Sequence, residues 1–141
     1  MELVKFYESV NQLETAYLAR WAVLEKFVKA VTAEYRRCML KHALRQWSAY
    51  VNGNLPVHPK ERLDTRLKAK HLPEKSEFIA ALNYFGFDGA ELWGIMGYEG
   101  KAKPRGFRNQ IAHTGRRFTR VQQYKKLSNL LALATRKTVG I

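Results

Sequence analysis

Apolar side chains recur at helical spacing along the first fifty residues, and no Gly or Pro interrupts them. Successive positions are three, four or five residues apart, which is typical of the buried face of an amphipathic helix. They are Leu3, Phe6, Val10, Leu13, Tyr17, Trp21, Leu24, Val28, Val31, Tyr35, Met39, Leu44, Trp47 and Val51. We therefore predict one very long helix from Glu2 to about Val51, or two helices with a break near Thr32.

Gly and Pro residues divide the middle of the chain into shorter segments. Residues 52–59 contain Gly and two Pro and are predicted to form a loop. Residues 60–72 have the pattern of a short polar helix, which Pro73 would stop. Residues 74–85 are predicted to form another helix, closed by Gly86.

Local end signals predict three further helices after Gly86. Asp88 and Glu91 have the spacing of a capping box, and Pro104 suits the first turn of a helix. The predicted helices run from Asp88 to Met96, from about Pro104 to His113 with a turn at Gly115, and from Thr119, paired with Gln122, to about Thr135. Because no segment has a convincing strand pattern, the fold class is all-α, a bundle of about five or six helices.

The length and composition indicate one globular domain over residues 1–141. Of its residues, 46% are hydrophobic and 12% aromatic, and Trp21, Trp47 and Trp93 lie in apolar stripes where we expect core packing. The lone Cys38 has no partner for a disulfide or a zinc knuckle. No stretch reaches the ~18 consecutive apolar residues of a membrane span. We therefore expect a cytoplasmic protein without membrane attachment.

The charges are distributed very unevenly along the chain. All twelve acidic residues lie between Glu2 and Glu99, whereas residues 100–141 carry eleven Lys and Arg, so +11 of the formal net charge of +13 is in the last 42 residues. This imbalance favours a polyanionic partner and predicts binding that weakens steeply with salt. We expect RNA to contact Lys101, Lys103, Arg105, Arg116, Arg117 and Arg120. The alternative is a solvated face that only keeps the protein soluble.

Few catalytic constellations fit this sequence. Residues 100–141 contain no paired carboxylates, and His42, His58, His71 and His113 are not spaced as metal ligands. No glycine-rich phosphate loop of the Walker or Rossmann type occurs. We therefore expect neither a metal nor a cofactor, and the remaining chemistry belongs to Arg, Asn and His side chains.

An Arg is followed by a His five positions later at three places. The pairs are Arg37–His42, Arg66–His71 and Arg108–His113, so the spacing alone does not identify a site. Only the third Arg is followed by Asn, and only there does a small apolar pair precede the His, in the string RNQIAH. We assign no role to the other three histidines.

The string RNQIAH resembles the ribonuclease motif of the HEPN superfamily of helical domains, in which an Arg and a polar residue precede a His after a short spacer. Here the motif residues are Arg108, Asn109 and His113, and the resemblance covers about eight residues. It implies a metal-independent endoribonuclease that cuts single-stranded RNA to 2′,3′-cyclic phosphate ends. It also implies a homodimer in which two motif helices face each other. Because HEPN domains serve in toxin–antitoxin and antiviral defence systems, an antitoxin or another defence protein is a further candidate partner.

Helix geometry makes one copy of the motif incomplete. Asn109 and His113 share a helix face, whereas Arg108 lies about 140° around the axis from His113, so a second copy could supply the missing side. His113 would transfer a proton near neutral pH, and Arg108 would stabilise charge developing on the phosphate oxygens. Asn109 would position the phosphate or His113. Glu25, between two apolar residues of the first helical segment, could also reach the site.

Two other functions fit the same residues. Residues 104–135 could form a helix-turn-helix that binds DNA, because Ile111, Gly115 and Val121 lie at separations of four and six, close to the pattern of that motif. The second helix, however, is too apolar for a recognition helix. A HEPN-like module could instead bind RNA, a nucleotide or a protein without catalysis. For His113 alone, the alternative is a structural histidine beside the last carbonyls of its helix.

Overall fold

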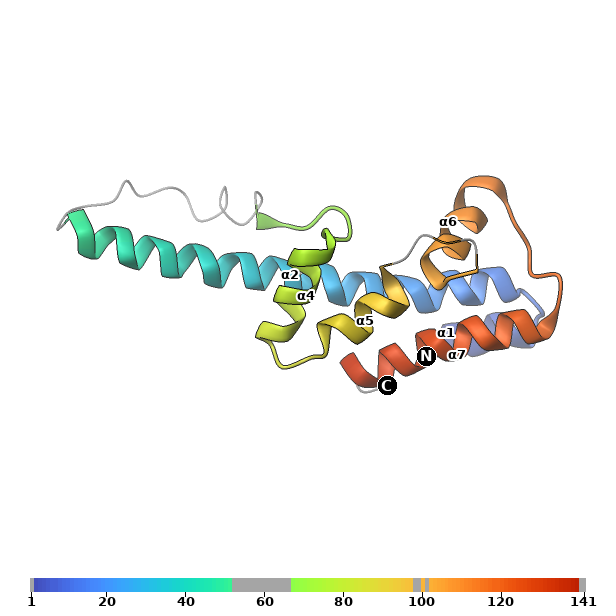
Figure 1. Ribbon diagram of the computed structural model, residues 1–141. Helices are drawn as coiled ribbons and strands as arrows, with labels where there is room; N and C mark the ends of the chain where they lie inside the picture. The colour runs from blue at the N-terminus through green and yellow to red at the C-terminus, as the bar shows by residue number, and fades with distance from the viewer. Residues whose placement is uncertain (1, 52–66, 98–99, 101, 140–141) are drawn as a thin grey trace.

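The computed structural model describes residues 2–51, 67–97, 100 and 102–139, with side chains as far as Gln46 in the first range. Within these ranges the structure is helical and contains no strand, which confirms the predicted all-α class. The helices are α1 (Glu2–Ser9), α2 (Leu13–Val51), α4 (Lys75–Tyr84), α5 (Gly89–Met96), α6 (Pro104–Thr114) and α7 (Val121–Thr138) (Figure 1). None of these helices has both the length and the apolar character that a membrane crossing requires.

The predicted first helix is broken, but near Asn11 and not near Thr32. Asn11 has a positive φ of 57°, and the amide of Gln12 donates to the carbonyl of Tyr7 at 2.8 Å, which ends α1 in a Schellman-type turn. Asn tolerates the left-handed conformation better than other residues with a side chain. Thr32 lies inside a continuous α2, buried, with its hydroxyl donating to the Val28 carbonyl at 2.8 Å.

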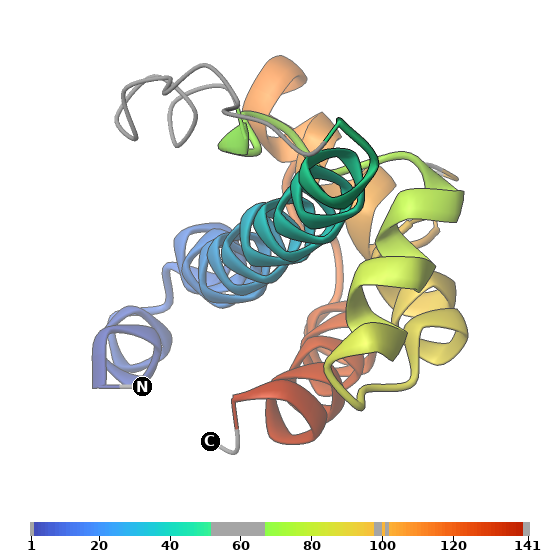
Figure 2. The same cartoon turned by 90° about the vertical axis from the view of Figure 1, so that its left-hand side faces the viewer.

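Helix α2 is the element around which the other helices pack. One face of its N-terminal half is buried and consists of Ala16, Tyr17, Trp21, Leu24, Val28 and Thr32. Helices α1, α4, α6 and α7 all contact α2, and α5 packs against α4, α6 and α7. Viewed along α2, these helices are arranged around its N-terminal half (Figure 2). Burial of a single stripe on one helix therefore organises the core.

The apolar stripe predicts too much burial at both ends. Leu3 and Phe6 are exposed, whereas Val4 is the buried residue of α1. At the other end Met39 and Leu44 are exposed, in the part of α2 that is bordered by Tyr84, the last residue of α4. Beyond this point α2 continues as a projecting helix (Figure 1).

The end signals predict most of the remaining helix boundaries correctly. Gly86 closes α4 with a φ of 88°. The Asp88 carboxylate accepts a hydrogen bond from the Glu91 amide at 3.1 Å at the start of α5. Two predictions concern residues 52–66, the loop and the first part of the polar helix, and lie outside the described residues. The prediction of a helix is wrong for the second part of this segment, because residues 68–74 are not helical.

The ends of α6 match the prediction, whereas the start of α7 does not. Pro104 occupies the first turn of α6, and Gly115 ends it with a φ of 68°. Helix α7 begins at Val121 with Arg120 in the capping position, so Thr119 is not its N-cap. The carboxylate of Glu14 on α2 instead accepts from the amide of Phe118 at 2.8 Å and fixes the connection just before α7.

The Asn11 turn can be tested by substitution. Asn11→Ala is expected to lower the free energy of unfolding by about 1 kcal/mol, because a Cβ-bearing residue without a local polar group disfavours a positive φ. Asn11→Gly, the matched control, should equal or exceed the wild type. Urea denaturation of the three proteins measures the difference. An alanine variant as stable as the wild type would show that α1 and α2 are not joined by this turn.

Candidate functional site

Helix α6 is held in place by a buried aromatic cluster. Phe107 is fully buried on its inner face, and its ring stacks on that of Phe118 with centroids 4.4 Å apart. Tyr17 of α2 lies against both rings, and its hydroxyl donates to the carbonyl of Pro104 at 2.8 Å. Burial raises the pKa of Tyr17, so the hydroxyl stays protonated as a donor. These contacts fix the rotation of α6 and hence the directions of the neighbouring motif side chains.

Arg108 is directed toward α2, where it meets a carboxylate. Its Nη2 lies 3.9 Å from Oε2 of Glu25, and its Nη1 donates to Oδ1 of Asn109 at 3.1 Å. Arg108 and Glu25 are half-buried, with side-chain exposures of 32% and 19%. The prediction that Glu25 reaches this part of the molecule is therefore confirmed, and the structure brings Arg108, Asn109 and Glu25 together.

Glu25 is held by two further donors on its own helix. Nε1 of Trp21 donates to Oε2 at 2.7 Å, and Nζ of Lys29 lies 2.7 Å from Oε1. Burial by itself raises the pKa of this carboxyl group. The hydrogen bonds from Lys29 and Trp21 and the charges of Lys29 and Arg108 outweigh that effect, so the pKa of Glu25 lies below its ordinary value. At neutral pH the group is a fixed negative charge that orients the Arg108 guanidinium.

His113 occupies the last turn of α6 and is exposed. It makes no hydrogen bond or ion pair with the described part of the chain, so it is not held against the last carbonyls of its helix. On a regular helix it shares a face with Asn109 and lies about 140° from Arg108. Within one chain, the structure therefore brings Arg108 and Asn109 together, whereas His113 is exposed and has no described contact with Glu25 or Arg108.

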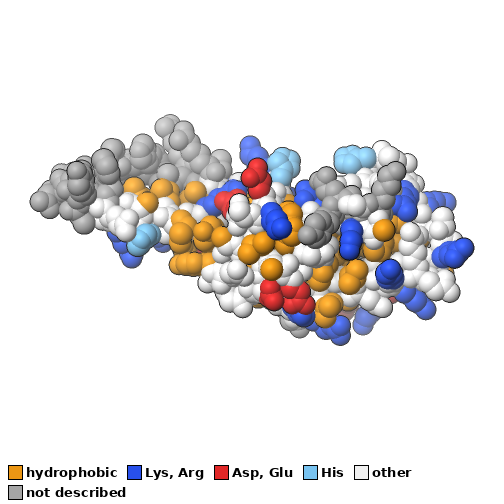
Figure 3. All heavy atoms as spheres, in the orientation of Figure 1, with side chains coloured by type: hydrophobic (Ala, Val, Ile, Leu, Met, Phe, Trp, Pro, Cys, Tyr) orange, Lys and Arg blue, Asp and Glu red, His pale blue; other side chains and the backbone are white. Residues whose placement is uncertain are grey.

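The residues predicted to bind RNA fall into two groups. Lys103, Arg117 and Arg120 are exposed, whereas Arg105 and Arg116 are half-buried and have partners within the protein. Arg105 donates to the carbonyl of Gly97 at 3.2 Å, and the Arg116 guanidinium lies 4.2 Å above the ring of Phe107. Lys101 lies outside the described residues. Basic side chains gather at the end of the molecule formed by α6, α7 and their connection (Figure 3).

The tryptophans and the other three histidines do not contribute to the candidate site. Trp21 is 2% exposed and Trp93 packs against Phe78, which confirms core packing for both; the side chain of Trp47 is not described. His42 and His71 are exposed, and His58 lies outside the described residues. No group of three or more His, Cys, Asp and Glu among the residues that the structure describes is arranged to hold a metal ion.

Sequence reasoning missed Trp21 and Lys29 as the residues that hold Glu25. The three residues are spaced four apart on one helix, so their side chains follow one another along a single face. That spacing was available as a signal. What the sequence could not show is that Arg108, more than eighty positions later, would meet the same face.

Comparison of the chain with models of protein families, with curated proteins and with solved structures finds no match.

The Glu25 network makes stability depend on pH. Because the pKa of Glu25 is lower in the folded protein than its ordinary value of 4.5, the stabilising contribution is complete above that pH and is lost as the pH falls through the folded pKa. Glu25→Gln should therefore lower the free energy of unfolding by about 1 kcal/mol near neutral pH and by much less at about pH 3.

Urea denaturation at the two pH values gives the measurement. Glu34→Gln is the matched control, because the Glu34 side chain is 47% exposed and paired only with Arg37 on the same helix among its described ion pairs, so the change should alter stability little at either pH. A Glu25→Gln effect of the same size at both pH values would show that the carboxylate charge contributes nothing.

Proposed function

We propose that this chain is a metal-independent endoribonuclease of the HEPN type that cleaves single-stranded RNA. The observation that carries the proposal is the arrangement on α6, where Arg108 is oriented by Asn109 and by the charge of Glu25 while His113 stands exposed to solvent. An imidazole can transfer the protons, and a guanidinium and an amide can bind and stabilise the phosphate oxygens, when a ribose 2′-hydroxyl attacks the adjacent phosphodiester.

The roles follow from the surroundings of each side chain. Arg108 stabilises the negative charge that develops on the phosphate oxygens, since its guanidinium is positioned before substrate arrives. His113, which is exposed, takes the proton from the 2′-hydroxyl or gives one to the 5′ leaving oxygen. Attack of the 2′-oxygen on the adjacent phosphorus breaks the bond to the 5′-oxygen and leaves a 2′,3′-cyclic phosphate.

A homodimer would bring these groups together. Within one chain Arg108 faces α2 and His113 faces outward, and Ala112, His113 and Thr114 leave the outer end of α6 exposed. In the proposed homodimer this end packs against its counterpart across a twofold axis, and His113 of each chain would act with Arg108 of the other. The exposed cations Arg117 and Arg120 follow this end of α6, Lys103 precedes the helix at its other end, and all three would hold the RNA backbone.

The alternative of a helix-turn-helix is less well supported. The second helix of that motif would be α7, but Tyr124, Leu127 and Leu131 are buried and the helix packs along α2. A recognition helix must present its face to the major groove, and α7 uses a whole face for the core. A non-catalytic RNA-binding module would have the same surface as the enzyme, so only activity distinguishes the two.

Substitution of the motif residues tests catalysis. His113→Ala should lower RNA cleavage by at least ~10²-fold while leaving RNA binding and the melting temperature unchanged, because the side chain is exposed and has no described partner. Arg108→Ala should lower cleavage by about 10²-fold or more, because it removes charge stabilisation from the transition state. A labelled single-stranded RNA and a gel assay measure both rates.

His42→Ala and His71→Ala are the matched controls, because each of these histidines also follows an Arg by five positions. Both variants should keep full activity. The motif assignment is wrong if the His71 variant is the inactive one, or if His113→Ala unfolds the protein.

Mixing two inactive variants tests the composite dimer. Arg108→Ala and His113→Ala chains, denatured together and refolded at equal concentration, should regain about a quarter of wild-type activity, because half of the dimers are mixed and each holds one intact site. Sedimentation equilibrium should give the dimer mass. No recovery in verified mixed dimers, or activity from a strictly monomeric protein at micromolar concentration, would contradict this arrangement.

A further inference from the structure

A hollow on the surface of α2 is lined in part by Glu25, the residue that pairs with Arg108. Its volume is about 520 Å³, within the range of small-molecule sites. One side is a face of α2, and the other is the non-helical segment that precedes α4. The residues that line it are Ala22, Glu25, Lys26, Lys29, Ala30, Ala33, Lys68 and Ala69.

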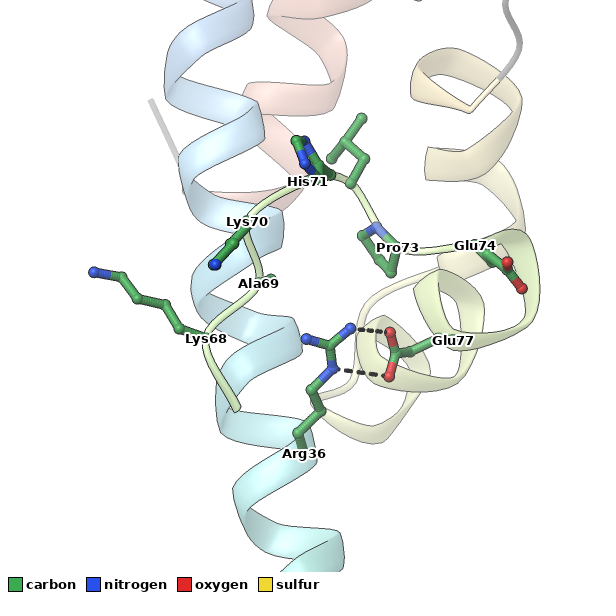
Figure 4. Close-up of a pocket in the computed structure, with 9 residues that line it drawn as sticks. Arg36, Lys68, Ala69, Lys70, His71, Pro73, Glu74 and Glu77 are labelled. Carbon is green, nitrogen blue, oxygen red and sulfur yellow. Dashed lines mark hydrogen bonds and ion pairs between the residues drawn. The ribbon is translucent and has the colours of Figure 1, made fainter. Parts of the chain in front are cut away.

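The segment before α4, which forms the second side of the hollow, is held in place by contacts with Arg36. Arg36 donates to the carbonyl of Leu67 at 3.3 Å and forms a two-point ion pair with Glu77 of α4. Ala69 is buried, with 7% of its surface exposed. In Figure 4 the side chain of Lys68 extends from this segment on the side away from Glu77. The position of Lys68 is therefore set by its anchored neighbours.

The lining is basic, and its one acidic side chain is already engaged. Lys26 and Lys68 are exposed and have no ion-pair partner among the described residues, while Lys29 is paired with Glu25. The Glu25 carboxylate also accepts from Trp21 and lies near Arg108, so it does not neutralise Lys26 or Lys68. Two ammonium groups on opposite sides of a hollow suit phosphate oxygens on a strand passing between them.

Between the lysines the surface is apolar and made of small side chains. Ala22, Ala30, Ala33 and Ala69 provide it, and their methyl groups leave the volume open. A flat apolar surface bordered by cations suits a ribose or base whose phosphates contact the cations. None of these residues belongs to the acid-free last 42 residues of the chain, so this hollow is separate from the basic surface that the sequence predicts.

We infer that this hollow binds the nucleotide adjacent to the phosphodiester that Arg108 contacts. Lys26 and Lys68 contact its phosphates, and the alanine surface contacts its ribose or base. The inference rests on the proposed ribonuclease function for the identity of the ligand, and on the hollow's own residues for its location. It extends the RNA path from α6 along α2 to the segment before α4.

Filling the hollow tests how its shape contributes to RNA binding, independently of its charge. Ala30→Met, which adds volume without changing charge at an exposed position, should weaken binding of a single-stranded hexauridylate by roughly 10-fold, as measured by fluorescence anisotropy in the inactive His113→Ala background. Ala43→Met, at an exposed position farther along the same helix, is the matched control and should bind like its parent.

Removing the two lysines tests the phosphate contacts. Lys26→Ala with Lys68→Ala should weaken binding and lower the slope of log affinity against log salt by about 1.4, at ~0.7 for each single-strand phosphate contact. Lys41→Ala on the exposed part of α2 should change neither quantity. Circular dichroism checks that each variant is folded.

The outcomes distinguish this site from the nuclease. Weaker binding by the filled and lysine-free variants supports the hollow even if no protein cleaves RNA, in which case the nuclease proposal alone fails. If the wild type cleaves RNA but the filled variant, the lysine-free variant and the controls bind alike, the hollow is not a nucleotide site and the nuclease proposal stands.

Discussion

Burial of one apolar stripe along the N-terminal half of α2 is the interaction from which the rest of the fold follows. Tyr17, Trp21, Leu24 and Val28 contribute large side chains to it, and α1, α4, α6 and α7 contact the same helix. Full burial of each such side chain is worth about 2 kcal/mol, so the stripe is a large part of the core. The rotation of α2 about its axis is thereby fixed, and with it the direction of every polar side chain on the helix.

The same constraint explains how a charged network can lie beside the core. Glu25 follows Leu24 on α2 and is carried to the edge of the buried stripe, where Trp21, a core residue, donates to it. Half-burial strengthens the attraction between this carboxylate and Arg108, and the neighbouring indole and ammonium donors of Trp21 and Lys29 keep the carboxylate ionised. Arg108 in turn reaches Glu25 because Phe107, the preceding residue, is locked into the aromatic cluster.

Local chemistry in the sequence predicts more of this structure than long-range pairing does. Gly86, Asp88, Pro104 and Gly115 mark helix ends correctly because each acts on the backbone within a few residues. The break at Asn11 was missed because an Asn inside a helical pattern need not adopt a positive φ. Periodicity also overstated burial at Leu3 and Met39, since a repeat identifies a face but not whether another element covers it.

For the candidate site, too, the sequence predicts local features better than long-range contacts. The string RNQIAH singles out three residues on one helix, and the position of Glu25 between two apolar residues of the first helical segment marks it as able to reach them. The pairing of Glu25 with Arg108, Trp21 and Lys29 is seen only in the structure. The hollow on α2 could not be predicted, because Lys68 enters it from a segment whose sequence pattern predicts a helix but which is not helical in the structure and is held by Arg36.

The central claim is that this protein cleaves RNA by acid–base chemistry of its own side chains. Its most direct test is incubation of the purified wild-type protein with an end-labelled single-stranded RNA in excess EDTA, followed by analysis of the product ends. The account predicts cleavage that EDTA does not inhibit, with 2′,3′-cyclic phosphate and 5′-hydroxyl ends. RNA that stays whole with and without EDTA, or cleavage that requires a divalent metal and leaves 5′-phosphate ends, would contradict it.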